Sequence, residues 1–222
     1  MSATASAIAC VGVPASYYFV PFGHACRHIY TDDMNLVMFS DSHGARPTIP
    51  EGDVLCVAGD VFCGDDLQSL RSDLRWLGSL PHKRKLFVQG NHDLVLKMQS
   101  NAEELLAEQG ITLLNNNSID VDGVRFYGVS YGATDIQPCD VLMSHVPPAG
   151  VLDKGLYGKA LGCPRLLTAV QRLKPRVHLF GHAHESAGHT KIDETDFYNC
   201  AERPTSVHIY TGSVAERPIA SD

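Results

Sequence analysis

The sequence lacks the apolar runs that membrane insertion requires. None of its 222 residues belongs to an uninterrupted apolar stretch of about 18 residues, the length that a membrane-spanning helix needs. The first 26 residues contain no Lys, Arg, Asp or Glu, and Pro14 and Pro21 interrupt them, whereas a secretory leader begins with basic residues and has an unbroken apolar centre. We therefore expect a cytoplasmic protein with no membrane partner.

Basic residues are also scarce. The chain has 18 Lys and Arg against 25 Asp and Glu, a formal net charge of -7. Because nucleic-acid surfaces normally need an excess of basic residues, an extended surface of that kind is not expected. A phosphate-bearing small molecule remains possible as a substrate, since bound metal ions can supply local positive charge.

Cysteine usage argues against a disulfide framework. The number of cysteines is odd, seven, and no C-x-x-C pair occurs. In a chain of this length the pattern fits a reducing compartment. No feature of the sequence predicts an oligomeric state.

The length and the 44% hydrophobic content suit one sizeable domain. We assign this domain to residues 34–222. Residues 1–33 are expected to form an N-terminal extension outside it, either poorly ordered or lying along its surface.

Continuous apolar runs predict buried strands at residues 35–40, 53–58, 85–89, 140–144 and 176–180. Helical spacing and capping signals predict helices from about residues 65 to 77, 101 to 110 and 164 to 174. Alternation around Asp122-Gly123 predicts a hairpin, and further strands are expected near Phe197 and at 207–210. The pattern indicates an α/β fold with two facing mixed sheets flanked by helices.

Polar residues directly follow each of the five buried strands, where layered α/β folds place their sites. Asp41 and His43 are two residues apart, so in an extended segment both can face one ion. Asp60 follows a glycine, and its carboxylate could bridge two cations. Asn91 offers a neutral oxygen, while His145, His182 and His184 offer imidazole nitrogens.

Each position taken alone has an ordinary structural explanation. Asp41 could cap a turn, and Asp60 and Asn91 are common turn residues. A lone histidine after a strand is more often hydrogen-bonded than metal-bound. The order and placement of all five segments nevertheless favour a site for two divalent cations, which is suited to attack of water on phosphorus.

In this order, Asp-x-His, Gly-Asp, Gly-Asn-His-Asp, His and Gly-His-x-His resemble the calcineurin-like metallophosphoesterase superfamily, from Met34 to His184. Residues 144–148 and 180–185 most resemble its MPPED-type branch of phosphodiesterases. The resemblance implies an αββα sandwich and a division of the ligands. One metal would take Asp41, His43, Asp60 and His184, and the other would take Asp60, Asn91, His145 and His182. The mixed nitrogen and oxygen ligands suit Mn, Fe or Zn, and the family often uses Mn or Fe.

The resemblance also implies that His92 is the general acid, or at least contacts the phosphate. Asp93 could then orient the His92 ring. The leading hypothesis is a phosphodiesterase acting on a small phosphate ester such as a cyclic nucleotide.

Two alternatives remain open. One is a phosphomonoesterase, including a protein phosphatase. Against it, residues 61–66 lack the arginine that serine/threonine phosphatases of the superfamily usually have, and those enzymes have Glu where this chain has Asp93. The other is a non-catalytic scaffold of the same fold, although every expected ligand type is present here.

Overall fold

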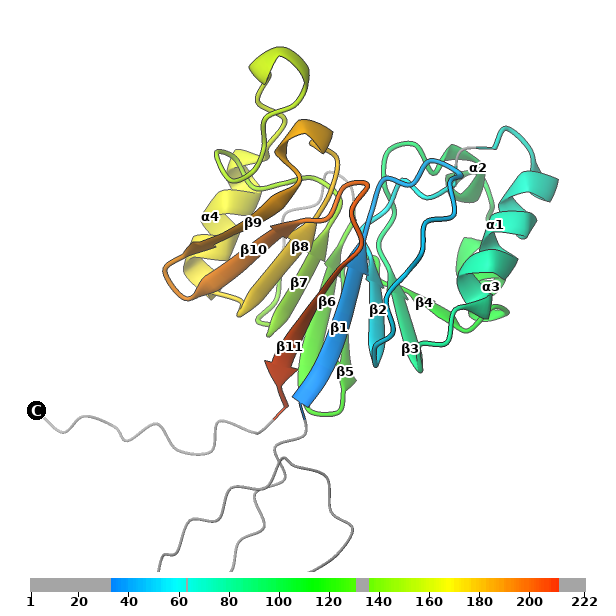
Figure 1. Cartoon of the computed structure of the whole chain (residues 1–222), viewed down its shortest axis with the longest axis horizontal. Coiled ribbons are helices and arrows are strands. Elements are labelled where there is room, and N and C mark those ends of the chain that lie inside the picture. Colours follow the sequence, from blue (N-terminus) through cyan, green and yellow to red (C-terminus); the bar gives the residue numbers. More distant parts are fainter. Residues whose placement is uncertain (1–32, 63, 131–135, 212–222) are drawn as a thin grey trace, which may run out of the picture.

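Two β-sheets face one another in the structure, with helices on their outer sides (Figure 1). This computed structural model describes residues 33–62, 64–130 and 136–211. The predicted α/β sandwich of two mixed sheets is confirmed. The extension predicted for residues 1–33 lies outside the described residues, apart from Asp33, which is the first residue of strand β1.

The first sheet has the order β11-β1-β2-β3-β4. Its strands β1 to β4 are parallel, and β11 joins β1 antiparallel. The bounds are β1 Asp33–Phe39, β2 Val54–Val57, β3 Arg84–Phe87, β4 Ile111–Leu113 and β11 Thr205–Tyr210.

The second sheet has the order β5-β6-β7-β8-β10-β9. Strands β6, β7, β8 and β10 are parallel, whereas β5 and β9 run antiparallel at the two edges. The bounds are β5 Asn117–Val121, β6 Val124–Val129, β7 Val141–Ser144, β8 Val177–Phe180, β9 Gly188–Ile192 and β10 Thr195–Asn199.

The sandwich is held together by strands that are buried on both faces. In β1, Leu36 and Met38 belong to the core between the sheets, while Val37 and Phe39 pack on the helical side. Because neighbouring side chains of a strand point to opposite faces, a strand covered on both sides is apolar throughout. This explains why the strands appear in the sequence as continuous apolar runs.

Helices cover both outer faces. The apolar faces of α1 and α3 pack on the first sheet and that of α4 on the second. The bounds are α1 Leu67–Ser79, α2 Leu94–Lys97, α3 Ala102–Ala107 and α4 Pro164–Leu173, with 3-10 turns η1 Leu156–Gly158 and η2 His184–Ser186. Within the described ranges, no helix combines the length and apolar character that crossing a bilayer would require.

The helix-start signals succeed at two helices and fail at a third. Asp66 caps α1 by accepting a hydrogen bond from the backbone N–H of Ser69 at 2.7 Å, and Pro164 opens α4. Asn101 and Glu104 match the sequence pattern of a capping box at the start of the helix predicted from residue 101, but this prediction is wrong, because the Asn101 side chain makes no capping hydrogen bond to α3. Strands β4 and β9 and helix α2 were not predicted, since each is short and lacks a distinctive pattern.

Candidate metal centre

Two groups of potential metal ligands lie at the carboxyl ends of the strands, and the predicted division of the ligands between two ions stays a prediction. In the first group, Asp41, His43 and His184 place their ligand atoms within 4.8 Å of one another. The Nε2 atom of His184 is 3.1 Å from Oδ1 of Asp41, and the rings of His43 and His184 are 5.5 Å apart. Asp41 and His43 follow β1 of the first sheet, whereas His184 follows β8 of the second.

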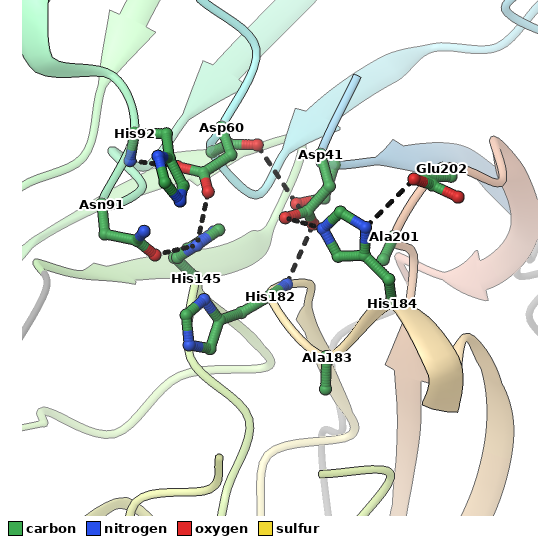
Figure 2. Close-up of polar contacts among 12 residues, drawn as sticks. Asp41, Asp60, Asn91, His92, His145, His182, Ala183, His184, Ala201 and Glu202 are labelled. Carbon is green, nitrogen blue, oxygen red and sulfur yellow. Dashed lines mark hydrogen bonds and ion pairs between the residues drawn. The ribbon is translucent and has the colours of Figure 1, made fainter. Parts of the chain in front are cut away.

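The second group contains Asp60, His145 and His182, again within 4.8 Å. Nε2 of His145 lies 3.2 Å from Oδ2 of Asp60 and 2.9 Å from Oδ1 of Asn91 (Figure 2). Asn91 therefore adds a neutral oxygen to this group. Both sheets again contribute, because Asp60 and Asn91 follow β2 and β3, and His145 follows β7.

All seven predicted ligands thus lie at one end of the sandwich. Carboxylate and amide oxygens mixed with imidazole nitrogens suit Mn, Fe or Zn. Asp60 groups with the second set, and its role as a ligand common to two ions stays a prediction. The residues fit a centre of two ions, one for each group.

Two glycines leave the space that the carboxylates of Asp60 and Asp41 occupy. A Cβ atom on Gly90 would lie 2.0 Å from Oδ1 of Asp60, and one on Gly181 would lie 2.1 Å from Oδ2 of Asp41. Real side chains do not approach so closely, so any larger residue would displace a ligand. The glycines before Asn91 and His182 are therefore parts of the centre.

Four of the ligands have left-handed backbone conformations. The φ angles are 57° at Asp41, 44° at His43, 54° at Asp60 and 69° at His182. Such angles are uncommon outside glycine and cost free energy, so the surrounding structure must hold them. Hydrogen bonds do so here: the N–H of Asp41 donates to the carbonyl of Gly59 at 3.0 Å, and that of His182 to Oδ2 of Asp41 at 2.9 Å. The sequence patterns contained no sign of this strain.

Asp93 supports the loop after β2 rather than the ring of His92. Its Oδ2 accepts the backbone N–H of Asp60 and of Gly90, at 2.9 and 2.8 Å, and its Oδ1 accepts those of Val61 and Phe62, both at 3.0 Å. Among the described residues, no hydrogen bond joins its carboxylate to His92. The orienting contact that we expected is therefore absent, because four amides already occupy the carboxylate.

His92 itself borders both groups. Its backbone N–H donates to Oδ1 of Asp60 at 2.7 Å, and its ring lies 5.4 Å from that of His43. The side chain is exposed, unlike those of Asp60 and His145. This position leaves the imidazole free to reach a bound molecule, as a general acid must.

The protein stabilises charge on the ligand carboxylate of the second group. Burial alone would raise the pKa of Asp60, but the hydrogen bond and charge from His145 outweigh burial, and the pKa falls below its ordinary value. In turn, burial would lower the pKa of His145, but the hydrogen bond and charge from Asp60 raise it. Asp60 is therefore ionised at neutral pH, as a ligand to a cation needs to be.

Sequence reasoning missed Glu202, whose Oε1 lies 3.0 Å from Nδ1 of His184 (Figure 2). It follows β10 and is 18 residues away from its partner in the chain. No motif marks it, and the pairing of β10 with β8 together with the bridge between Ser40 and Ala201 brings it to the site.

Comparisons with known proteins found similar sequences. A family model described as calcineurin-like phosphoesterase matches residues 28–186. The UPF0046 protein K07C11.7 of Caenorhabditis elegans is 33% identical over 207 residues, covering 78% of this chain and 71% of that protein. Human metallophosphoesterase domain-containing protein 1 is 31% identical over 215 residues, covering 74% of this chain and 65% of that protein.

A solved structure supports the fold. The crystal structure of the protein TT1561 of Thermus thermophilus superposes with a TM-score of 0.51 at 12% identity, covering 81% of this chain and 99% of that one. At this identity the likeness concerns the fold alone.

Proposed function

Because the chain belongs to the calcineurin-like phosphoesterase family, we propose that it is a metal-dependent phosphodiesterase that hydrolyses a small phosphate diester such as a cyclic nucleotide. The observation that carries the proposal is the pair of adjacent ligand groups, Asp41, His43, His184 and Asp60, His145, His182. When two divalent ions are bound, such a centre supplies an activated water and neutralises charge on the phosphoryl oxygens. Manganese is the ion that we propose, with iron or zinc as alternatives.

The protein's own residues supply the remaining chemistry. His92 would donate a proton to the departing alkoxide, since its ring is exposed beside the ring of His43. Asp60 and Asn91 would hold the second ion together with His145 and His182, and Asp60 would also contact the first ion. The carboxylates of Asp41 and Asp60 are buried and already accept hydrogen bonds from backbone N–H groups, so they need little reorganisation to bind the ions.

A small substrate suits the space beside the first group. A cavity of about 240 Å³ adjoins Asp41 and His43, and its walls include Phe39, Pro47 and Pro204. Its mixture of apolar walls and a few polar groups is typical of a site for a small organic group. This supports a substrate with a small organic group.

The experiment that tests the proposal combines metal analysis with hydrolysis. Metal-free protein is supplied with Mn²⁺, bound metal is counted, and turnover of bis-p-nitrophenyl phosphate is compared with that of p-nitrophenyl phosphate. We expect two ions per chain and a higher kcat/KM for the diester. Asp60→Ala should lose bound metal and at least about 100-fold in activity, while the exposed variant Asp120→Ala should match the unmodified protein.

Other outcomes would redirect the assignment. Faster hydrolysis of the monoester would favour a phosphomonoesterase. Two bound ions without turnover of either ester would favour a scaffold. An Asp60→Ala protein that keeps both ions and full activity would remove Asp60 from the centre.

A further inference from the structure

The His184 ring lies between two carboxylates (Figure 2). Its Nε2 is 3.1 Å from Oδ1 of Asp41, and its Nδ1 is 3.0 Å from Oε1 of Glu202. A neutral imidazole has one N–H and one lone pair. If Nδ1–H donates to Glu202, the lone pair of Nε2 faces Asp41, which is where a metal of the first group would bind.

We propose that Glu202 is a positioning residue of the metal centre: its carboxylate fixes the tautomer and the orientation of His184, so that Nε2 serves as ligand to the ion of the first group. The inference rests on the two-metal centre of the proposed function. Carboxylates that accept the second N–H of a ligand histidine raise its basicity and orient its ring.

The backbone places Glu202 beside the ligand that it would support. Its N–H donates to the carbonyl of Ser40 at 3.0 Å, and Ser40 and Ala201 form a parallel bridge. Its φ angle of 57° is left-handed, which a non-glycine residue adopts at a cost. Since Ser40 directly precedes Asp41, one backbone segment fixes both Asp41 and the partner of His184.

The second group contains a counterpart to this contact. His145 places its Nδ1 2.7 Å from the carbonyl oxygen of Ala58, while its Nε2 faces Asp60 and Asn91. In each group, then, one histidine has its far nitrogen tied to an acceptor oxygen. The acceptor is a buried backbone carbonyl in one case and a side chain that is 63% exposed in the other.

Because the Glu202 side chain is exposed, its contact with His184 should orient the ring rather than stabilise the fold. An exposed ion pair contributes little to the free energy of unfolding. Loss of the Glu202 carboxylate should therefore leave the fold unchanged and free the His184 ring to rotate. The ion of the first group should be the one affected, because the second group keeps its own acceptor.

The test is a titration of the metal-free full-length protein with Mn²⁺, in which the affinities of the two sites are measured separately. Glu202→Ala should weaken one of the two sites by about 10- to 100-fold and leave the other unchanged. Glu202→Gln retains an acceptor oxygen and should recover most of the lost affinity. Glu194→Ala removes the same charge from the exposed turn between β9 and β10 and should behave like the unmodified protein.

A second measurement reads the ring directly. In the protein loaded with Zn²⁺, the nitrogen resonances of His184 should show a protected Nδ1–H, and Glu202→Ala should lose that protection. Equal metal affinities in Glu202→Ala and the unmodified protein would overturn the inference while leaving the centre in place. A parallel loss at both sites, with a lower Tm of the metal-free variant, would overturn it in favour of a structural role. If the unmodified protein binds no divalent ion, the proposed function fails and the role of Glu202 fails with it.

Discussion

Gly90 and Gly181 mark the points where single residues of the centre have least room. Each approaches a carboxylate so closely that an added Cβ would lie about 2 Å from a ligand oxygen of Asp60 or Asp41. The carboxylates are themselves tied to backbone N–H groups and cannot retreat without breaking those bonds. The positions of the Asp41 and Asp60 carboxylates therefore depend on the absence of a side chain at Gly181 and Gly90.

Gly90→Ala should fold but bind Mn²⁺ at least about 10-fold more weakly, because Asp60 must move to admit the methyl group. The measurement is a metal titration of the variant beside Gly110→Ala. Gly110 has a φ of 69° and nothing within 4 Å of the added atom, so that control strains the backbone without touching a ligand. Unchanged affinity in Gly90→Ala would contradict the close approach.

His92→Ala should retain both ions and lose turnover on a diester with a poor leaving group by about 10²- to 10⁴-fold. The loss should be smaller for bis-p-nitrophenyl phosphate, whose leaving group needs little protonation. Metal content and kcat on the two substrates are the measurements. Equal effects on both substrates would argue against proton donation.

Among the elements, the ends of β2 and β3 are joined by one side chain. Asp93 is the residue before α2, yet its carboxylate does not cap that helix. It instead accepts the N–H groups of the segment after β2 and of Gly90 after β3. Burial is the largest influence on this carboxyl and raises its pKa, although the amide hydrogen bonds oppose the rise. Asp93 thereby holds Asp60 and Asn91 in register with one another.

Asp93→Asn should lower the free energy of unfolding by about 2–6 kcal/mol, because an amide has a single acceptor oxygen and leaves about two buried N–H groups unpaired. The Tm of the metal-free protein measures this loss, and metal affinity should fall as Asp60 shifts. Asp66→Asn is the matched control, since Asp66 is exposed and Asn caps helices equally well. A variant with an unchanged Tm and reduced turnover would instead restore a role for Asp93 beside His92.

The elements show what the sequence could predict. The central strands are predicted because burial on both faces makes their sequences continuously apolar. Helix α1 is predicted because burial on one face gives its sequence a periodic apolar pattern. The candidate ligands could be located in the sequence because each of them follows a strand. The four hydrogen bonds of Asp93 and the contact of Glu202 depend on distant segments meeting in space, which no local pattern records. The left-handed backbone angles of Asp41 and Asp60 could not be predicted either, since aspartate, unlike glycine, is not a residue type that indicates a positive φ.

The whole molecule carries an acid-sensitive group outside the metal centre. His178 in β8 is fully buried and contacts the rings of Phe180 and Phe197, and burial lowers its pKa to about 3. Ser144 donates its hydroxyl hydrogen to the carbonyl of Val146, so Nε2 of His178 must donate to the Ser144 oxygen, 2.9 Å away. The folded protein thus holds this ring neutral.

The free energy of unfolding should consequently decrease as the pH is lowered below about 6.5. The unfolded chain binds a proton at His178 near pH 6.5, whereas the folded protein does so only near pH 3. Between these values each unit by which the pH falls should lower the free energy of unfolding by about 1.4 kcal/mol. His178→Gln should flatten this part of the profile, which chemical unfolding of metal-free protein from pH 7 to 4.5 would measure. Identical slopes in the two proteins would exclude His178 as the source.

The pairing of β1 with β11 has a practical consequence for rearranging the chain. Asp33 and Tyr210 are direct partners in that pair, and the Asp122-Gly123 turn lies close by, since a Cβ on Gly123 would be 3.4 Å from the carbonyl of Thr211. All three points are at the opposite end of the strands from the candidate ligands, because β1 and β6 begin there and the ligands follow the carboxyl ends. A circular permutant of residues 33–210, joined by a short linker from Tyr210 to Asp33 and opened at the turn, should keep the geometry of the candidate ligands, because every change lies at the far end of the strands. The same end is the natural place to attach a dye or a solid support.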